Sequence, residues 1–224
     1  MANIKNIRLL AERLRLGNLS NGIIDLTNEQ PEHLEFLELI LQKEVDARDE
    51  ADYQKRRIRS QLPAKQYHKE LSRGSMSWQV EMLEKLDWVH DTQNIVIIGK
   101  CNTGKTSLAA HVGMIALEKT MRVYYCKVED FLCILKNSEA EKYKRILSYI
   151  STCGILIIDD TMYTSLVLED LRVLYHGIMR FNEALSLVVI SNRELSAWIE
   201  SAADKHIMET LVDRLTGYSQ IVRL

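Results

Sequence analysis

Eight consecutive residues match the pattern G-x-x-x-x-G-K-[ST] and indicate phosphate chemistry. They are Gly99-Lys100-Cys101-Asn102-Thr103-Gly104-Lys105-Thr106. Glycines at the fixed positions let successive backbone N–H groups turn toward phosphate oxygens. Lys105 adds a cation for the phosphates, and the hydroxyl of Thr106 is a ligand suited to Mg²⁺. We therefore expect a nucleotide-binding loop formed by Gly99, Lys100, Cys101, Asn102, Thr103, Gly104, Lys105, Thr106 and Ser107.

Two carboxylates follow a second apolar run. Ile155-Leu156-Ile157-Ile158 leads directly into Asp159 and Asp160. In open α/β sheets, ligands lie at the carboxyl ends of the strands, so both acids are expected to face the nucleotide. We expect Asp159 to hold the magnesium and Asp160 to orient or deprotonate the attacking water. The alternative is an ordinary polar turn at the end of a strand.

A third apolar run, Leu185 to Ile190, ends in Ser191-Asn192-Arg193. A polar side chain at such a strand tip, beside the terminal phosphate, senses that phosphate and helps to place the attacking water. We expect this catalytic role for Asn192, and the alternative is an asparagine that merely starts a loop. Nothing local decides whether Arg193 contacts phosphate, DNA or solvent.

These residues need a sheet to position them, and the second part of the chain predicts one. Short, continuous apolar runs alternate with helical patterns, as in a parallel sheet that is covered by helices on both faces. The predicted strands are 94–98, 122–126, 154–158, 185–190 and 219–222, and the predicted helices are 104–119, 128–150, 165–183 and 195–215.

The order of these strands narrows the class of nucleotide-binding protein. One strand separates the phosphate-loop strand from the acidic strand in the sequence, and the strand that ends at Asn192 comes next. That order favours ATPases with an inserted central strand over nucleotide kinases and small GTPases. An Asn-Lys-x-Asp guanine-reading sequence does not occur, which favours ATP over GTP.

Before residue 90, apolar residues recur at helical spacing. The pattern predicts a short helix from about Ile4 to Leu16, a polar turn at 17–22, and a long helix that begins near Pro31 and ends near Pro63. Thr27 or Asn28 is the expected cap of the long helix. We expect a helical N-terminal domain at 1–62 for DNA or partner contact, a linker and lead-in helix at 63–90, and an ATPase core at 91–224.

Composition sets the broad class. The chain is 46% hydrophobic and 27% charged, with a net charge of -2, which is typical of a globular protein rather than a polycation. The four cysteines form no Cys-x-x-Cys pair, so we expect buried, reduced thiols, and the histidines show no zinc spacing. Neither a signal peptide nor a membrane-length apolar run is present, so a cytoplasmic protein without membrane contact is expected.

Two basic segments stand out against this average charge. Residues 55–73 hold seven basic side chains and one acid, Glu70. Such density neutralises DNA phosphates without reading sequence, although basic residues also favour a helix C-terminus for electrostatic reasons. A second cluster around Lys136 is diluted by Glu139 and Glu141. The expected DNA contacts are Lys55, Arg56, Arg57, Arg59, Lys142, Lys144 and Arg145, with Lys65, Lys69 and Arg73 completing the first segment.

Three further segments give the chain a family resemblance. Phe36-Leu37-Glu38-Leu39-Ile40-Leu41, Arg56-Arg57-Ile58-Arg59 and Leu211-Val212-Asp213-Arg214-Leu215 accompany the motifs above. With them, the chain resembles the IstB-like AAA+ ATPases, relatives of the DnaC and DnaI helicase loaders and of the DnaA initiator. The resemblance implies an α/β, three-layer P-loop AAA+ ATPase with a five-stranded parallel sheet, preceded by a small all-α N-terminal domain.

The resemblance also implies a function. It points to a transposition helper that binds ATP and Mg²⁺, assembles as a homo-oligomer on duplex DNA with ATP at subunit interfaces, and assists a transposase. Arg214 would then be an arginine finger for a neighbouring subunit, and the alternative is an arginine paired with Asp213 or Glu209. Other functions left open are a replicative helicase loader and a nucleotide-binding scaffold with negligible hydrolysis.

Two departures from the family pattern bear on catalysis. Asp160 is one methylene shorter than the Glu common in related ATPases, so hydrolysis is expected to be slow without DNA and oligomerisation. Relatives usually carry a further sensor arginine beyond the last strand, whereas this sequence stops at Leu224. Either that sensor is absent or the chain is truncated relative to its relatives.

Overall fold

The computed structural model describes residues 3–68, 75–162 and 166–224. The chain divides into two compact units, Met1–Lys55 and Arg56–Leu224. The division falls inside the long helix α3 (Pro31–Arg59). The end of this helix belongs to the second unit because the carbonyl of Ser60 accepts a hydrogen bond of 2.8 Å from the backbone N–H of Tyr125.

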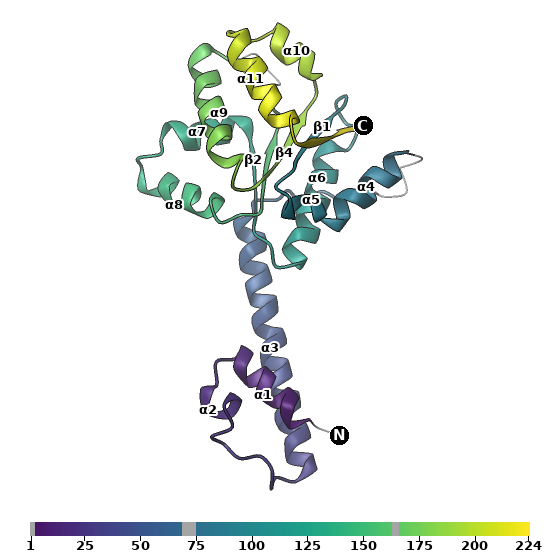
Figure 1. Ribbon diagram of the computed structural model, residues 1–224, viewed down its shortest axis with the longest axis vertical. Helices are drawn as coiled ribbons and strands as arrows, with labels where there is room; N and C mark the ends of the chain where they lie inside the picture. The colour runs from purple at the N-terminus through teal and green to yellow at the C-terminus, as the bar shows by residue number, and fades with distance from the viewer. Residues whose placement is uncertain (1–2, 69–74, 163–165) are drawn as a thin grey trace. The chain divides into compact units, whose positions relative to one another are not determined.

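The first unit is built from α1 (Ile4–Arg13), α2 (Gly17–Ser20) and the first part of α3 (Figure 1). Asn3 caps α1 by accepting a hydrogen bond from the N–H of Lys5. The start of α3 at Pro31 confirms the prediction, but its expected cap was wrong. The carbonyl of Gln30 accepts from the N–H groups of His33 and Leu34, and the Thr27 hydroxyl donates to Asp25 instead. The core of this unit contains Ile7, Leu10, Ala11, Leu14, Leu19, Leu26, Leu41 and Val45.

The second unit contains a five-stranded parallel sheet whose strands are shifted by no more than one residue from their predicted ends. They are β1 (Asn94–Ile98), β2 (Val123–Lys127), β3 (Ile155–Asp159), β4 (Ser186–Ser191) and β5 (Ser219–Arg223). Their order is β2-β3-β4-β1-β5, and every pair is parallel (Figure 1). The inserted central strand is β4, as the order of the motifs predicted.

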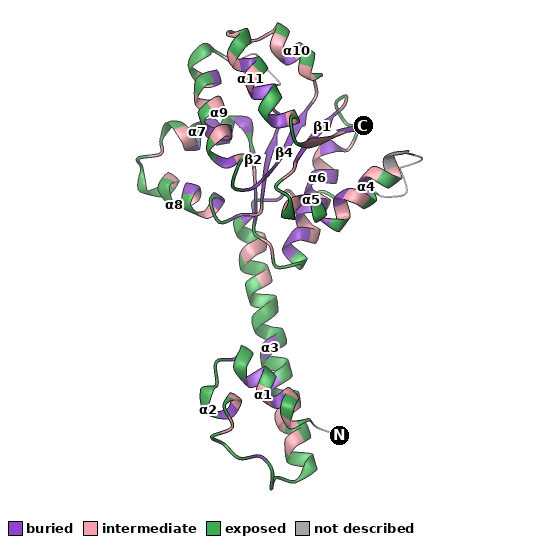
Figure 2. Cartoon of the chain, viewed as in Figure 1, coloured by how far each residue is buried: buried purple, intermediate pink, exposed green. Residues whose placement is uncertain are grey.

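Helices cover both faces of this sheet and make three layers. The helices of this unit after the end of α3 are α4 (Ser75–Lys85), α5 (Asp87–His90), α6 (Lys105–Glu118), α7 (Val128–Lys136), α8 (Glu141–Ile150), α9 (Leu168–Phe181), α10 (Leu195–Glu200) and α11 (Lys205–Thr216). Residues of β1, β3 and β4 are buried at every position, as expected for strands covered on both faces (Figure 2). Leu156 and Ile158 pack with α7, α9 and α11, whereas Ile157 faces α6 at Gly113.

Two segments predicted as single helices are each broken in two. Residues 137–140 separate α7 from α8, and the Asn137 side chain donates a hydrogen bond to the carbonyl of Cys133. Residues 201–204 separate α10 from α11, where Asp204 caps α11 by accepting from the N–H of Ile207. Short polar side chains satisfy backbone groups locally and so end helices. The predicted helix 165–183 is α9, and Ser165 lies outside the described residues.

The cysteines divide into two buried and two exposed thiols. Cys126 and Cys153 are buried, whereas Cys101 and Cys133 are exposed, so the expectation of four buried thiols was wrong for this pair. Burial raises the pKa of Cys153 to about 12 and also raises the pKa of Cys126. Among the described residues, no helix is long and apolar enough to cross a bilayer.

Candidate nucleotide-binding site

A cavity of about 710 Å³ opens at the carboxyl end of the sheet, where the chemistry-bearing residues were expected to meet. Its wall combines the phosphate loop with the ends of β2, β3 and β4. The lining residues are Lys65, Cys101, Asn102, Gly104, Lys105, Thr106, Ser107, Tyr125, Lys127, Glu129, Asp159, Asp160 and Asn192. A mostly polar wall of this kind suits a charged ligand.

The phosphate loop is shaped by left-handed backbone at two positions. Asn102 has φ of 63° and Gly104 has φ of 91°, immediately before α6 begins at Lys105. This places the first N–H groups of α6 at the cavity, where they favour anions. Gly99 allows a different close approach, because an added Cβ would lie 2.2 Å from the carbonyl oxygen of Leu224. The loop therefore depends on glycine both for its turn and for its packing.

Lys105 is 6% exposed and donates a hydrogen bond of 2.6 Å from Nζ to the carbonyl of Lys100. Burial lowers the pKa of Lys105, although Asp159 and Asp160 act in the opposite direction. A cation that is already largely desolvated loses little hydration free energy when a polyanion binds, so its electrostatic attraction to the phosphates is strong. This position suits the phosphate-binding role predicted for Lys105.

Two hard oxygen ligands converge beside the loop. Thr106 Oγ1 donates to Asp159 Oδ2 at 2.7 Å, and the same oxygen accepts from the hydroxyl of Tyr125 at 2.8 Å. Asp159 Oδ1 accepts from the N–H of Asp160 at 2.7 Å, so both carboxylate oxygens are engaged. Hydroxyl and carboxylate oxygens are ligands that Mg²⁺ prefers, and Asp159 is only 3% exposed. The residues present therefore fit a magnesium ion bound with phosphates.

Asp160 is held differently from its neighbour. Its φ of 55° puts the backbone in the left-handed region, which turns the chain sharply after β3. Its Oδ2 lies 2.8 Å from Nζ of Lys127 at the end of β2, and both side chains are partly exposed. The hydrogen bond that Lys127 donates to Asp160 raises the pKa of Lys127, which keeps this lysine charged. Asp160 thus faces the cavity while it is paired with a cation.

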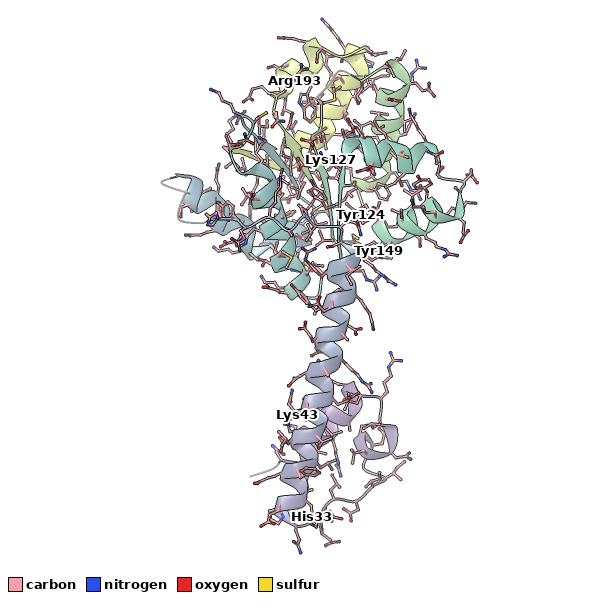
Figure 3. The ribbon with its side chains drawn as sticks, turned by 180° about the vertical axis from the view of Figure 1, so that it is seen from behind. His33, Lys43, Tyr124, Lys127, Tyr149 and Arg193 are labelled. Atoms are coloured by element: carbon pink, nitrogen blue, oxygen red, sulfur yellow. The ribbon has the colours of Figure 1, made fainter. Side chains whose placement is uncertain are left out.

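Asn192 reaches the cavity from the tip of β4, where a small network fixes the turn. Ser191 Oγ accepts from the indole N–H of Trp198 and from the N–H of Arg193, both at 3.0 Å. Trp198 is fully buried, so the start of the turn is anchored in the core. Arg193, which is labelled in Figure 3, donates from its guanidinium to Ser201 Oγ at 3.3 Å and is not among the residues that line the cavity.

The structure thus brings together most of the predicted site residues. Asp159, Asp160 and Asn192 line one cavity with the phosphate loop, whereas Gly99, Lys100 and Thr103 support the loop from outside the lining. Arg214 is exposed on α11 and does not line the cavity, and it forms no ion pair with Asp213, Glu209 or any other described residue. The arginine-finger role expected for Arg214 would therefore be played in the cavity of a neighbouring subunit.

Sequence reasoning missed several lining residues. Tyr125 and Lys127 stand at the carboxyl end of β2, and Glu129 follows them. The rule that located Asp159, applied to the end of the second predicted strand, would have found them. Lys65 was assigned to a DNA-binding segment but lines the nucleotide cavity. Lys69, Glu70 and Arg73 of that segment lie outside the described residues.

The basic end of α3 has protein partners. Lys55 pairs with Asp52, Arg57 donates to the carbonyl of Leu62 at 2.8 Å, and Arg59 lies over the ring of Tyr149. Arg56 Nε is buried without a hydrogen-bond partner. These contacts agree with the alternative interpretation of a basic helix end that stabilises its own C-terminus, and they leave DNA contact here as an expectation.

The second basic cluster is also mostly paired. Lys136 forms an ion pair with Asp170, Lys144 with Glu139 and Arg145 with Glu141. Lys142 differs, because its ammonium group lies over the ring of Tyr143 and has no ion-pair partner among the described residues. Of the expected contacts in this cluster, Lys142 is therefore the cation that is available for an external anion.

A parallel sheet of this order, with a phosphate loop after β1, an acidic end on β3 and a polar tip on the inserted β4, defines an AAA+ P-loop ATP-binding domain. Residues 10–224 match the family described as IstB-like ATP binding protein, and the chain belongs to this family. The expected family and fold class are thereby confirmed.

Two curated relatives are similar over nearly the whole of this chain. The insertion sequence IS21-like ATP-binding protein of Bacteroides fragilis is 30% identical over 240 residues, which cover 100% of this chain and 90% of the relative. The IS21 ATP-binding protein of Pseudomonas aeruginosa is 24% identical and covers 97% of this chain and 86% of the relative.

Solved structures share the fold. The DnaC helicase loader matches with a TM-score of 0.56 at 18% identity, covering 70% of this chain and 93% of that chain. AMPPCP-bound DnaA from Aquifex aeolicus also matches with a TM-score of 0.56, at 19% identity, covering 73% of this chain and 51% of that chain.

Proposed function

We propose that this protein hydrolyses ATP to ADP and phosphate while assembled on duplex DNA, and that it assists a transposase in moving an insertion sequence. The observation that carries the hydrolytic part is the meeting of the phosphate loop, Asp159, Asp160 and Asn192 in one cavity. Support for the biological setting comes from the relatives, whose names place them in insertion sequences.

Each group in the cavity has a defined task in this proposal. Backbone N–H groups of the loop and Lys105 bind the phosphates, and Lys105 leaves the carbonyl of Lys100 to do so. Thr106 and Asp159 would hold Mg²⁺, which would supply charge neutralisation for the phosphates. Asp160 accepts a proton from the attacking water, and the Asn192 amide orients that water against the terminal phosphate.

A complete active site requires a second copy of the chain. Arg214 is exposed and outside its own cavity, so it is free to reach the site of a neighbour. A guanidinium placed there stabilises charge on the phosphoryl group in the transition state. Assembly on DNA then brings sites and arginines together, so hydrolysis responds to DNA.

A combined measurement tests this function. We expect phosphate release to accelerate when a duplex oligonucleotide is added, and the acceleration to fall steeply with salt because phosphate contacts release counterions. Size-exclusion chromatography should show larger assemblies with ATP and DNA than with ADP. A rate that is unchanged by DNA at low salt, with a monomer in every nucleotide state, would contradict the proposal.

A further inference from the structure

A cavity of about 350 Å³ lies in the first unit, along α1 and beside the end of α2 (Figure 1). All but one of its lining residues belong to α1 or cap it, and the remaining one is Ser20 of α2. The lining residues are Asn3, Lys5, Asn6, Arg8, Leu9, Glu12 and Ser20. None of these residues lines the nucleotide cavity, so the binding and hydrolysis of ATP leave this cavity without a task.

Arg8 is the residue of this cavity that most needs a partner. Its Nε atom is buried without a hydrogen-bond partner, and its guanidinium forms no ion pair within the part of the chain that the structure describes. The guanidinium lies against Gly22, where an added Cβ would be 3.0 Å from Nη2 of Arg8. A charge that is partly removed from water is unfavourable until it is paired. This arginine therefore gains from an external anion.

The nearby acids do not supply that anion. Glu12 lies one helical turn after Arg8, but the two form no ion pair in the described ranges. Asp25 accepts hydrogen bonds from the N–H and the hydroxyl of Thr27, and these bonds lower the pKa of Asp25 more than the charge of Arg8 does. Lys5 adds a second cation, so the wall carries two cations and one carboxylate.

Exposed apolar side chains adjoin these cations. Leu9 lines the cavity and is 57% exposed. Ile23 and Ile24 are 72% and 48% exposed. They directly follow Gly22, the residue against which Arg8 lies. Apolar side chains that gather in water beside polar groups mark a surface for binding another molecule. The cavity thus offers charge pairing at its wall and apolar contacts around it.

These features select the class of ligand. Residues 1–55 carry seven Lys or Arg against eleven Asp or Glu, a net charge of -4 that repels a polyanion such as DNA. Exposed leucine and isoleucine side chains also offer nothing to phosphates. A peptide segment in which one Asp or Glu is flanked by apolar residues satisfies both the arginine and the apolar side chains. The ligand is therefore expected to be a protein.

The place of the cavity in the sequence favours a partner that differs from one relative to another. The family match covers residues 10–224, so Lys5, Arg8 and Leu9 lie before the matched residues. Residues that recognise a particular partner need not be shared by a family whose common property is ATP binding. A helper protein that serves its own transposase needs a contact of this kind.

We propose that the cavity docks a segment of the partner transposase, in which an Asp or Glu pairs with Arg8 and Lys5. Leu9, Ile23 and Ile24 cover the apolar residues on either side of that acid. This inference rests on the proposed function and names the surface through which the partner is recognised.

The central experiment compares two arginines of α1. The transposase of the same insertion sequence carries a fluorophore and is titrated with the full-length wild type, Arg8→Ala and Arg13→Ala. We expect Arg8→Ala to raise Kd by about 30-fold or more, as for truncation of one partner of a desolvated charge pair. Arg13 is paired with Asp49 at the surface, so Arg13→Ala should stay within about twofold of the wild type.

Two further measurements keep the test independent of folding. Leu9 is exposed, so Leu9→Ser should keep the wild-type thermal unfolding curve and still weaken binding. Overlapping synthetic peptides that span the transposase identify the docked segment. We expect the peptide that binds to contain an Asp or Glu between apolar residues. Changing that acid to its amide should weaken binding to the wild type and have little further effect on Arg8→Ala.

Hydrolysis of ATP separates this inference from the proposed function. Arg8 lies outside the nucleotide cavity, so Arg8→Ala should keep the wild-type rate with duplex DNA. Transposase binding that is unchanged in both Arg8→Ala and Leu9→Ser overturns the inference alone, as does a docked peptide without an acid. Loss of self-assembly in Arg8→Ala with unchanged transposase binding assigns the cavity to a second copy and also overturns it. A wild type that does not bind the transposase overturns the inference and the proposed partner together.

Discussion

Asp160 combines a left-handed backbone with an ion pair, and both features set where its carboxylate lies. Aspartate tolerates this backbone region better than most residues, because its short polar side chain hydrogen-bonds locally. A carboxylate that is both oriented and charged is suited to act as a base in the nucleotide cavity. The role of Asp160 is therefore testable by changing its charge alone.

We expect Asp160→Asn to bind ATP with nearly wild-type affinity and to lose about 10²- to 10⁴-fold in kcat, the range for loss of a general base. The carboxamide keeps the size of the side chain but cannot accept the proton. Nucleotide titration and phosphate release measure the two effects separately. Asp160→Glu is the matched control, and an Asp160→Asn protein with undiminished turnover would remove Asp160 from the mechanism.

The thiols give a second residue-level prediction. In the native protein, Cys101 and Cys133 should react with a thiol reagent, while Cys126 and Cys153 should not, since burial raises the pKa of both. ATP with Mg²⁺ should protect Cys101, which lines the nucleotide cavity, and leave Cys133 reactive. Mass spectrometry of labelled peptides identifies the sites, and protection of Cys133 by ATP alone would contradict the assignment.

Local patterns predicted some site residues and missed others for a physical reason. The phosphate loop and Asp159 follow from short motifs, because adjacent residues fix the backbone that binds phosphate. The Lys127–Asp160 pair depends on the register in which Lys127 lies opposite Asp159 across two strands. Register is set by tertiary packing, so such a partner is visible only once strands are paired.

At the level of elements, α6 shows how packing overrides helix propensity. Gly113 is a poor helix former in the middle of α6. A Cβ at this position would lie 2.8 Å from Cδ2 of Leu62, which follows the end of α3 and is buried. The glycine therefore admits Leu62 against the helix, and this contact anchors the segment after α3 to the phosphate-loop helix.

A double-mutant cycle tests that contact. We expect Gly113→Ala alone to destabilise the protein by about 1 kcal/mol, because an overpacking cost of about 1–3 kcal/mol exceeds the gain of about 1 kcal/mol in helix propensity. In a Leu62→Ala background the new methyl has room, so Gly113→Ala should become neutral or stabilising. Urea denaturation measures all four free energies of unfolding, and additive effects would contradict the contact.

The strands were predicted more accurately than the breaks within two of the predicted helices. Continuous apolar runs located β1, β3 and β4, because a strand buried on both faces needs apolar residues throughout. The breaks before α8 and α11 were missed, since apolar spacing continues across them while Asn137 and Asp204 satisfy the backbone locally. Local capping competes with helix continuation, and apolar periodicity does not report that competition.

At the scale of the whole molecule, charge is divided between the two units. Residues 1–55 carry seven Lys or Arg and eleven Asp or Glu, whereas residues 56–224 carry 22 and 20. The first unit is therefore acidic, with a net charge of -4, and the second unit has a net charge of +2. Because an acidic surface repels DNA phosphates, this division of charge favours the second unit over the first for the DNA contact proposed above.

Subunit mixing tests the arrangement of the assembly. Arg214→Ala keeps an intact cavity but supplies no finger, while Lys105→Ala supplies Arg214 but lacks the phosphate-binding cation. Each protein alone should lose on the order of 10³-fold in DNA-stimulated rate. An equimolar mixture should recover activity to about a quarter of the wild-type rate. About one interface in four then joins a cavity that contains Lys105, from an Arg214→Ala subunit, to an Arg214 from a Lys105→Ala subunit. A mixture that stays inactive would contradict an arginine supplied in trans.

The strand order has a mechanical consequence. The central strand β4 is hydrogen-bonded to β1 on one side and β3 on the other, so Asn192 stands on the stiffest part of the sheet. The outer strand β2, with a strand on one side only, is the most compliant member that reaches the nucleotide. A nucleotide bound between them would therefore meet a stiffly held side chain at Asn192 and a more easily displaced one at Lys127.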